Sequence, residues 1–200
     1  MDTPKRIPLI PTKTQQEAID IGIAHYSSSN DRGLLVISCG GGKTLVSIKI
    51  VEGTNPPVRR VLVVVPTLLL VKQTIEDWIN NWGRTTLDLI AACSEKGIKD
   101  GIGVDDIRNV AGITVATNID QLAKQIEPDV PKGHTQLIVT TYASLLNVSQ
   151  AVAQVNEGRD KYDRVQFDYV VGDENHHTAG VLRKRASKKE KAYKAIHDNN

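Results

Sequence analysis

The stretch Ser38-Cys39-Gly40-Gly41-Gly42-Lys43-Thr44 lies between an apolar run, residues 34–37, and an apolar helical pattern at 45–50. A strand, a glycine-rich turn ending in Lys-Thr and a helix together form the context of a phosphate-binding loop. Glycines let backbone N–H groups close around phosphate oxygens, and the helix directs its positive N-terminal end at them. We call residues 38–44 the glycine loop, and they predict a site for the phosphates of a nucleotide.

Two side chains of the glycine loop have expected roles. Lys43 would reach the outer phosphates, and the Thr44 hydroxyl would ligate Mg²⁺. The full eight-position pattern has a glycine at its first place, where Ile37 stands in this chain. A glycine-rich hairpin turn is the alternative, and it is less favoured because a turn does not require Lys-Thr at the start of a helix.

The composition suits a soluble globular protein of one domain or slightly more, with 200 residues, 40% hydrophobic and 24% charged. The longest mainly apolar run, 61–71, is interrupted by Pro66-Thr67 and is shorter than the roughly 20 residues of a membrane helix. No apolar signal segment follows the N-terminus, and two cysteines form no disulfide framework. We expect an intracellular protein without a membrane partner, cytoplasmic and nucleoid-associated in a bacterium or phage and nuclear in a eukaryote.

Charge is unevenly distributed along the chain. The net charge is +2, but residues 181–200 contain seven Lys or Arg and two acids, so they contribute +5 and the remainder −3. Such a basic end could follow a nucleic-acid backbone. A solvated helix face is the alternative, and charge alone favours it.

Strand and helix patterns alternate along the chain, which predicts an α/β fold: a mainly parallel sheet with helices on both faces. Thr14 and Glu17 are spaced as a capping box for the first helix, and the glycine- and aspartate-rich residues 94–112 are expected to form a loop. The predicted strands are 34–37, 61–65, 87–92, 113–117, 135–141 and 167–171, and the predicted helices are 14–26, 45–53, 68–82, 118–127, 143–155 and 187–198.

Four polar segments follow predicted strands, so all four are expected at the ligand-binding rim of the sheet. They are the glycine loop, Pro66-Thr67, Thr140-Thr141-Tyr142 and Asp173-Glu174. Two acids at the end of a buried strand are costly unless paired or bound to metal. An aspartate there can hold Mg²⁺, and the adjacent acid can orient or deprotonate an attacking water.

These motifs, in this order, resemble the first RecA-like lobe of a superfamily 2 DEAH-type helicase, of the restriction-enzyme and phage or plasmid type. The glycine loop resembles motif I, residues 63–73 motif Ia, and Asp173-Glu174-Asn175-His176 motif II. Thr140-Thr141-Tyr142 and the element Gln15-Gln16-Glu17 also have counterparts. The resemblance implies a RecA-like phosphate-loop NTPase, with residues 1–31 as a lead-in and glutamine-containing helix and 32–200 as the ATP-binding lobe.

The resemblance also implies roles for individual residues. Ser38, Cys39, Gly40, Gly41, Gly42, Lys43 and Thr44 would cradle the phosphates of ATP, and Thr44 and Asp173 would hold Mg²⁺. Glu174 would be the general base, and His176 would couple nucleotide state to the nucleic-acid site. Gln15 would read the adenine edge, with Gln16 as the alternative. Pro66, Thr67, Thr140 and Thr141 would contact the phosphate backbone of one strand, DNA rather than RNA.

Some positions depart from the family pattern. Gly41 replaces the usual Ser or Thr, Asn175 replaces Ala, and Thr12 stands where the arginine near the glutamine element is usual. The chain ends at Asn200, shortly after motif II and before the Ser/Thr-Ala-Thr element and a second RecA-like lobe. We therefore expect a fragment, a truncated product or one half of a split motor, with little or no ATPase activity until a second lobe joins it in cis or in trans.

Two further functions fit parts of the sequence. A non-catalytic RecA-like module could bind nucleic acid or a partner through the basic residues 183–194, in which case DNA binding would not depend on ATP. A small-molecule kinase could use the same glycine loop, but it gives no role to motif II or to the Thr-Thr-Tyr element.

Overall fold

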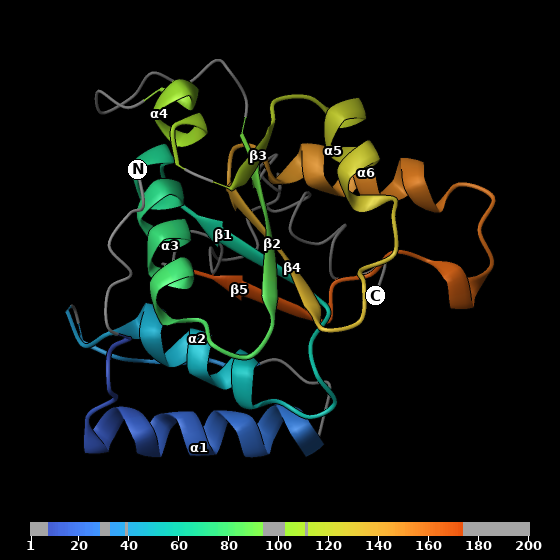
Figure 1. The fold of residues 1–200 in the computed structure, drawn as a ribbon. Helices are drawn as coiled ribbons and strands as arrows, with labels where there is room; N and C mark the ends of the chain where they lie inside the picture. The colour runs from blue at the N-terminus through green and yellow to red at the C-terminus, as the bar shows by residue number, and fades with distance from the viewer. Residues whose placement is uncertain (1–7, 29–32, 39, 94–102, 111, 174–200) are drawn as a thin grey trace, which may run out of the picture.

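The computed structural model describes residues 8–28, 33–38, 40–93, 103–110 and 112–173 (Figure 1). Within them lies one sheet of five parallel strands in the order β3-β2-β4-β1-β5, as the alternating pattern predicts. The strands are β1 (Arg60–Val65), β2 (Thr86–Ala92), β3 (Ile113–Ala116), β4 (His134–Thr141) and β5 (Tyr169–Gly172).

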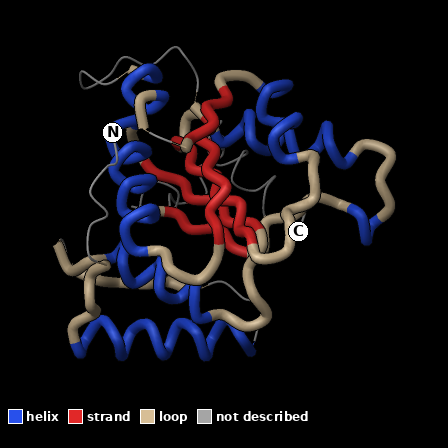
Figure 2. Tube along the Cα trace, viewed as in Figure 1, coloured by secondary structure: helices blue, strands red, loops and turns tan. Residues whose placement is uncertain are grey.

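Helices lie on both sides of this sheet (Figure 2). On one face α2 and α3 pack around the buried Ile48, Ile75 and Trp78, and α5 and α6 pack on the other face around Leu122 and Val148. Helix α1 packs on α2 at the outside of the molecule. The helices are α1 (Lys13–Ser28), α2 (Lys43–Gly53), α3 (Leu68–Asn81), α4 (Val104–Arg108), α5 (Ile119–Ile126) and α6 (Leu145–Asn156), with one 3-10 turn at Lys161–Asp163.

Strand β1 shows why the continuous apolar run is buried on both faces. All six of its residues are buried. Val61, Val63 and Val65 belong to the cluster under α2 and α3, whereas Leu62 and Val64 belong to the cluster under α5 and α6. Successive side chains of a strand point to opposite faces, so β-branched and leucine side chains at every position supply both cores.

The amino ends of the strands are joined by a polar network around the buried Arg60. The Asp168 carboxylate accepts hydrogen bonds from the backbone N–H groups of Arg59 and Arg60, at 2.7 and 2.8 Å. The Arg60 guanidinium donates to the carbonyl oxygens of Ile126 and Pro128, at 3.1 and 2.6 Å, where α5 ends. Burial lowers the pKa of Arg60 from its ordinary value, and the network satisfies the carbonyl groups that a helix C-terminus leaves unpaired.

The predicted strand at 34–37 is wrong for the described part of the chain. The segment belongs to no sheet, and Leu34 and Val36 are 81% and 82% exposed. A strand is defined by backbone hydrogen bonds to a neighbouring strand, and the described structure gives this segment no such pairing. Ile37 instead packs against the α1–α2 cluster.

Two local predictions also need correction. The first helix begins one residue before Thr14, and its capping pair is Thr12 and Gln15 rather than Thr14 and Glu17. Helix α4 was not predicted inside the 94–112 loop, although the fully buried Ile107 anchors it in the core. The predicted helix 187–198 lies outside the described residues. No helix in the described ranges is long and apolar enough to cross a bilayer.

Candidate functional site

The carboxyl ends of β1, β4 and β5 meet at one rim of the sheet. Val65 lies opposite Thr141, and Val64 lies opposite Gly172. The pairing continues past the strands, because the Tyr142 N–H donates to the Val65 carbonyl at 3.1 Å and the Asp173 N–H donates to the Val64 carbonyl at 2.9 Å. Three of the predicted polar segments are therefore neighbours at this rim: Pro66-Thr67, Thr140-Thr141-Tyr142 and Asp173.

Two residues of the glycine loop have a backbone conformation that favours glycine. Gly40 and Gly42 have φ angles of 75° and 79°, in the left-handed region that favours glycine. The Gly41 N–H donates to the Ser38 carbonyl at 3.0 Å, and a Cβ on Gly41 would lie 2.4 Å from the Ile37 Cγ2. The three glycines thus form a compact turn in front of α2.

The N-terminus of α2 has the features of an anion-binding site. Gly42 is its N-cap residue and supplies no side-chain hydrogen bond, and the first turn contains no acid. The first N–H groups of a helix have no partner within the helix, and the helix dipole adds positive potential there. Lys43 and Thr44 open the helix and are both half-buried. Phosphate groups match this donor set, and these two residues are the ones that would hold them.

Thr44 and Asp173 are the two residues that would hold Mg²⁺, and the site that they would form stays a prediction. A hydroxyl and a carboxylate are hard ligands of the kind Mg²⁺ selects, and Mg²⁺ completes its shell with water and phosphate oxygens. When bound, the metal would neutralise charge on the phosphates. Asp173 is half-buried at the rim. Cys39, Glu174 and His176, the other residues predicted for this site, lie outside the described residues.

Gln15 contacts the glycine loop directly. Its Nε2 donates to the Gly41 carbonyl at 2.9 Å, and its Oε1 accepts from the Thr12 N–H at 2.8 Å. Gln16 instead donates to Asp20 at 2.8 Å on the exposed side of α1. The structure therefore brings Gln15, and not the alternative Gln16, to the loop. Both ends of its side-chain amide are engaged, and the contact with adenine stays a prediction.

The predicted nucleic-acid residues divide into two pairs. Pro66 and Thr67 are half-buried at the rim, and the Thr67 hydroxyl caps α3 by accepting from the Leu70 N–H at 3.3 Å. Thr140 and Thr141 are 0% and 6% exposed. Their hydroxyls contact the Ala92 carbonyl at 2.7 Å and the Ser144 hydroxyl at 3.3 Å. The hydroxyls of both threonines are thus engaged within the protein, and the contact of these residues with a nucleic-acid strand stays a prediction.

Tyr142 has no individual role predicted from its sequence position. Its hydroxyl donates to the Asp173 carbonyl at 2.7 Å, so it links the Thr-Thr-Tyr segment to the predicted magnesium ligand. The tyrosine stood in the quoted motif, but nothing in the sequence shows that β1 lies between β4 and β5. The contact therefore follows from the sheet order.

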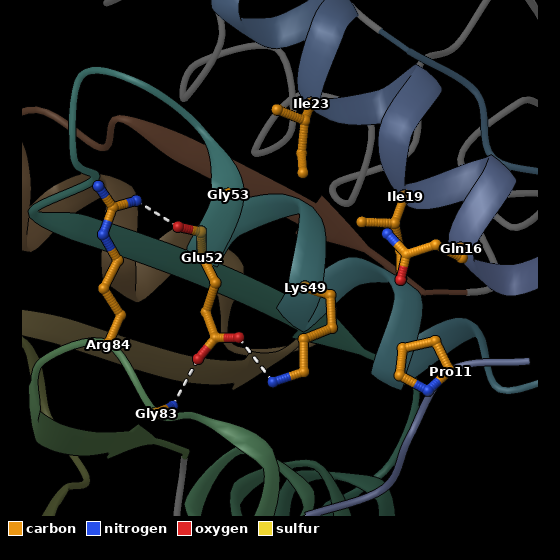
Figure 3. Close-up of a pocket in the computed structure, with 9 residues that line it drawn as sticks. All are labelled: Pro11, Gln16, Ile19, Ile23, Lys49, Glu52, Gly53, Gly83 and Arg84. Atoms are coloured by element: carbon orange, nitrogen blue, oxygen red, sulfur yellow. Dashed lines mark hydrogen bonds and ion pairs between the residues drawn. The ribbon is translucent and has the colours of Figure 1, made fainter.

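A cleft of about 530 Å³ lies between α1, α2 and the turn after α3 (Figure 3). Its polar walls are already paired: the Lys49 ammonium donates to the Glu52 carboxylate at 2.6 Å and to the Asn81 carbonyl at 2.7 Å. Arg84 contacts the Glu52 carbonyl, and the Gly83 N–H contacts the Glu52 carboxylate. Among the residues predicted for the site, Gln16, the alternative to Gln15, lines this cleft, which joins the C-terminal end of α2 to the α3–β2 turn.

The all-parallel sheet, with a glycine loop before α2, is the RecA-like lobe of a helicase-type motor. Residues 9–200 match the family described as type III restriction enzyme, res subunit, and the chain belongs to this family. No match was found among curated proteins.

Two solved structures show the same fold. One is described as the ATP-dependent type ISP restriction-modification enzyme LlaBIII bound to DNA; it is 30% identical with a TM-score of 0.69, over 96% of this chain and 12% of that one. The other is a nuclease-deletion mutant of the type ISP enzyme LlaGI in complex with a DNA substrate mimic, 24% identical with a TM-score of 0.60, over 84% of this chain and 15% of that one. The chain thus spans a small part of each.

Proposed function

We propose that this chain is the ATP-binding first motor lobe of a nucleic-acid helicase or translocase that acts on DNA. The observation that carries the proposal is the N-terminus of α2, which has no side-chain cap and follows a turn with left-handed glycines at positions 40 and 42. Family membership supports the same reading. The DNA named for the LlaBIII structure supports DNA as the nucleic acid.

In this proposal the chain provides one half of an ATP site. Loop N–H groups and Lys43 bind the phosphates, and Thr44 and Asp173 hold Mg²⁺. Glu174 serves as the general base, and His176 communicates with the nucleic-acid side. Pro66 and Thr67 contact the strand backbone. Residues 1–31 form the lead-in and glutamine-containing helix, and 32–200 form the lobe.

A second RecA-like lobe, in cis or in trans, is the expected partner. Stabilisation of the transition state by an arginine from outside is worth roughly 10³–10⁵ in rate in phosphate-loop enzymes. The lobe alone therefore binds Mg-ATP but hydrolyses it slowly.

The test is titration of the chain with Mg-ATP. Lys43→Ala is expected to abolish binding, because it removes the charge that faces the outer phosphates. Lys132→Ala is the matched control, since Lys132 is exposed in the turn before β4, at the amino ends of the strands. Equal affinity of the Lys43 variant and the unchanged chain would refute the proposal. DNA binding that is independent of ATP, and is lost on neutralising residues 183–194, would favour the non-catalytic module.

A further inference from the structure

Tyr142 lies where three strands end. It is 4% exposed, and its backbone N–H continues the pairing of β4 with β1. Its hydroxyl donates to the Asp173 carbonyl, just past β5, at 2.7 Å. Because β1 lies between β4 and β5, the contact joins strands two spacings apart, roughly 10 Å. The side chain therefore crosses the end of an intervening strand, which a short polar side chain cannot do.

Thr140 and Thr141, the two residues before Tyr142, hold the backbone from which the tyrosine side chain extends. The Thr140 hydroxyl donates to the Ala92 carbonyl of β2 at 2.7 Å. The Thr141 carbonyl accepts from the Ser144 N–H at 2.9 Å, which closes a turn around Tyr142. The three hydroxyls of Thr-Thr-Tyr thus reach three different neighbours: β2, the start of α6 and the end of β5. We call Thr140-Thr141-Tyr142 the brace, because its hydroxyl groups connect three neighbouring elements at the rim.

The brace holds the main chain of Asp173 from both sides. The Asp173 N–H is bonded to the Val64 carbonyl at 2.9 Å, and its carbonyl is bonded to Tyr142. With both peptide groups held, the point from which the carboxylate extends is fixed. The same carbonyl belongs to the peptide bond that leads to Glu174.

We propose that Tyr142 is a positioning residue for the magnesium site: its hydroxyl fixes the backbone from which the Asp173 carboxylate reaches the metal. This inference rests on the proposed function and deepens it. Groups that orient a metal ligand without touching the metal commonly contribute to metal affinity. The brace also connects the metal ligand to the rim beside Pro66-Thr67, where a nucleic-acid strand would lie.

The test compares Tyr142→Phe, which removes only the hydroxyl, with Tyr162→Phe, whose tyrosine is 95% exposed. A fluorescent ATP analogue is titrated into each folded chain, once with Mn²⁺ and once with EDTA. We expect Tyr142→Phe to weaken Mn²⁺-dependent binding about five- to tenfold and binding in EDTA by less than about twofold. Tyr162→Phe should match the unchanged chain in both titrations, and the Mn²⁺ resonance spectrum should change only in Tyr142→Phe.

A double-mutant cycle with Asp173→Asn decides whether the hydroxyl acts through the carboxylate. If it does, Tyr142→Phe has no further effect on Mn²⁺-dependent binding once Asp173 is changed. A Tyr142→Phe chain that binds with Mn²⁺ as the unchanged chain does would overturn the inference alone. An equal loss in Mn²⁺ and EDTA would also overturn it, because the hydroxyl would then serve the fold. Failure of the unchanged chain to bind Mn-nucleotide would overturn the proposed function, and the inference with it.

Discussion

Gln15 is the residue that ties the first helix to the glycine loop. It accepts from the Thr12 N–H at the start of α1 and donates to the Gly41 carbonyl. Loss of such a cap and contact costs about 1 kcal/mol. We expect Gln15→Ala to lower the free energy of unfolding by this amount and to weaken ATP binding.

Gln16→Ala is the matched control for this prediction. Gln16 is exposed and donates to Asp20 within the same helix, so the change should stay within about 0.5 kcal/mol. Urea unfolding and ATP titration measure both variants. A larger loss of ATP affinity in the Gln16 variant would mean that the glutamine element is displaced by one residue.

Gly42 combines a backbone constraint with a packing constraint. Its φ is 79°, and an added Cβ would lie 2.4 Å from the Gln15 Nε2. Gly158 has a similar φ of 75°, with nothing within 4 Å of an added Cβ. Gly158→Ala should cost about 1–2 kcal/mol of backbone strain. Gly42→Ala should cost about 1 kcal/mol more in urea unfolding, because Gln15 must release Gly41. Equal losses in the two variants would contradict this.

Among the elements, α5 depends on a residue from another part of the fold. The buried Arg60 of β1 donates to the Ile126 and Pro128 carbonyls and to the Gln136 side chain. We expect Arg60→Ala to lower the free energy of unfolding by about 2–4 kcal/mol, since buried carbonyls lose a charged donor. The neighbouring Arg59 is exposed, and its guanidinium donates to the Val130 carbonyl at 2.7 Å. Arg59→Ala should therefore cost under about 1.5 kcal/mol in the same denaturation experiment.

The elements themselves were largely predictable where apolar periodicity and capping residues agree. The Asn118 side chain caps α5 by accepting from the Gln121 N–H at 2.9 Å, as expected. The buried runs gave β1 and β4 to within a residue at each end. Residues 34–37 have the same apolar, β-branched composition, yet they form no strand because strand formation also depends on a partner. Composition does not reveal whether that partner is present.

At the scale of the whole molecule, the strand order was not predictable from the chain. Periodicity identifies each strand separately, whereas the order β3-β2-β4-β1-β5 depends on which helix covers which face. The position of Asp173 could be anticipated, because any parallel sheet presents its carboxyl ends at one rim. The burial of Thr140 and the contact of Tyr142 could not, since both depend on the neighbouring strands.

The exposed segment 34–37 should affect the behaviour of the whole molecule in solution. Leu34 and Val36 are 81% and 82% exposed, an apolar surface of the kind that promotes association. We expect Leu34→Lys combined with Val36→Lys to reduce binding of a hydrophobic dye and self-association in analytical ultracentrifugation. The free energy of unfolding should change by less than about 0.5 kcal/mol.

Ile37→Ser serves as the comparison for that double variant. Ile37 packs against the α1–α2 cluster, so its replacement should destabilise the fold by about 1–3 kcal/mol without reducing dye binding. Dye binding that persists in the double variant would place the apolar surface elsewhere on the molecule.

Residues 33–38 are also part of the chain segment that connects α1 to α2. Exposed backbone of this kind is where proteases cut first. A single cut within 33–38 would leave α2 and β1 to β5 on one continuous chain. Helix α1 would then be held by non-covalent contacts, among them its packing against Val46 and Ile50, the ring contact of Tyr26 with Tyr169, and the Gln15 hydrogen bond to Gly41. Measuring whether α1 stays bound after the cut would therefore give the strength of its non-covalent contacts alone, without the covalent connection.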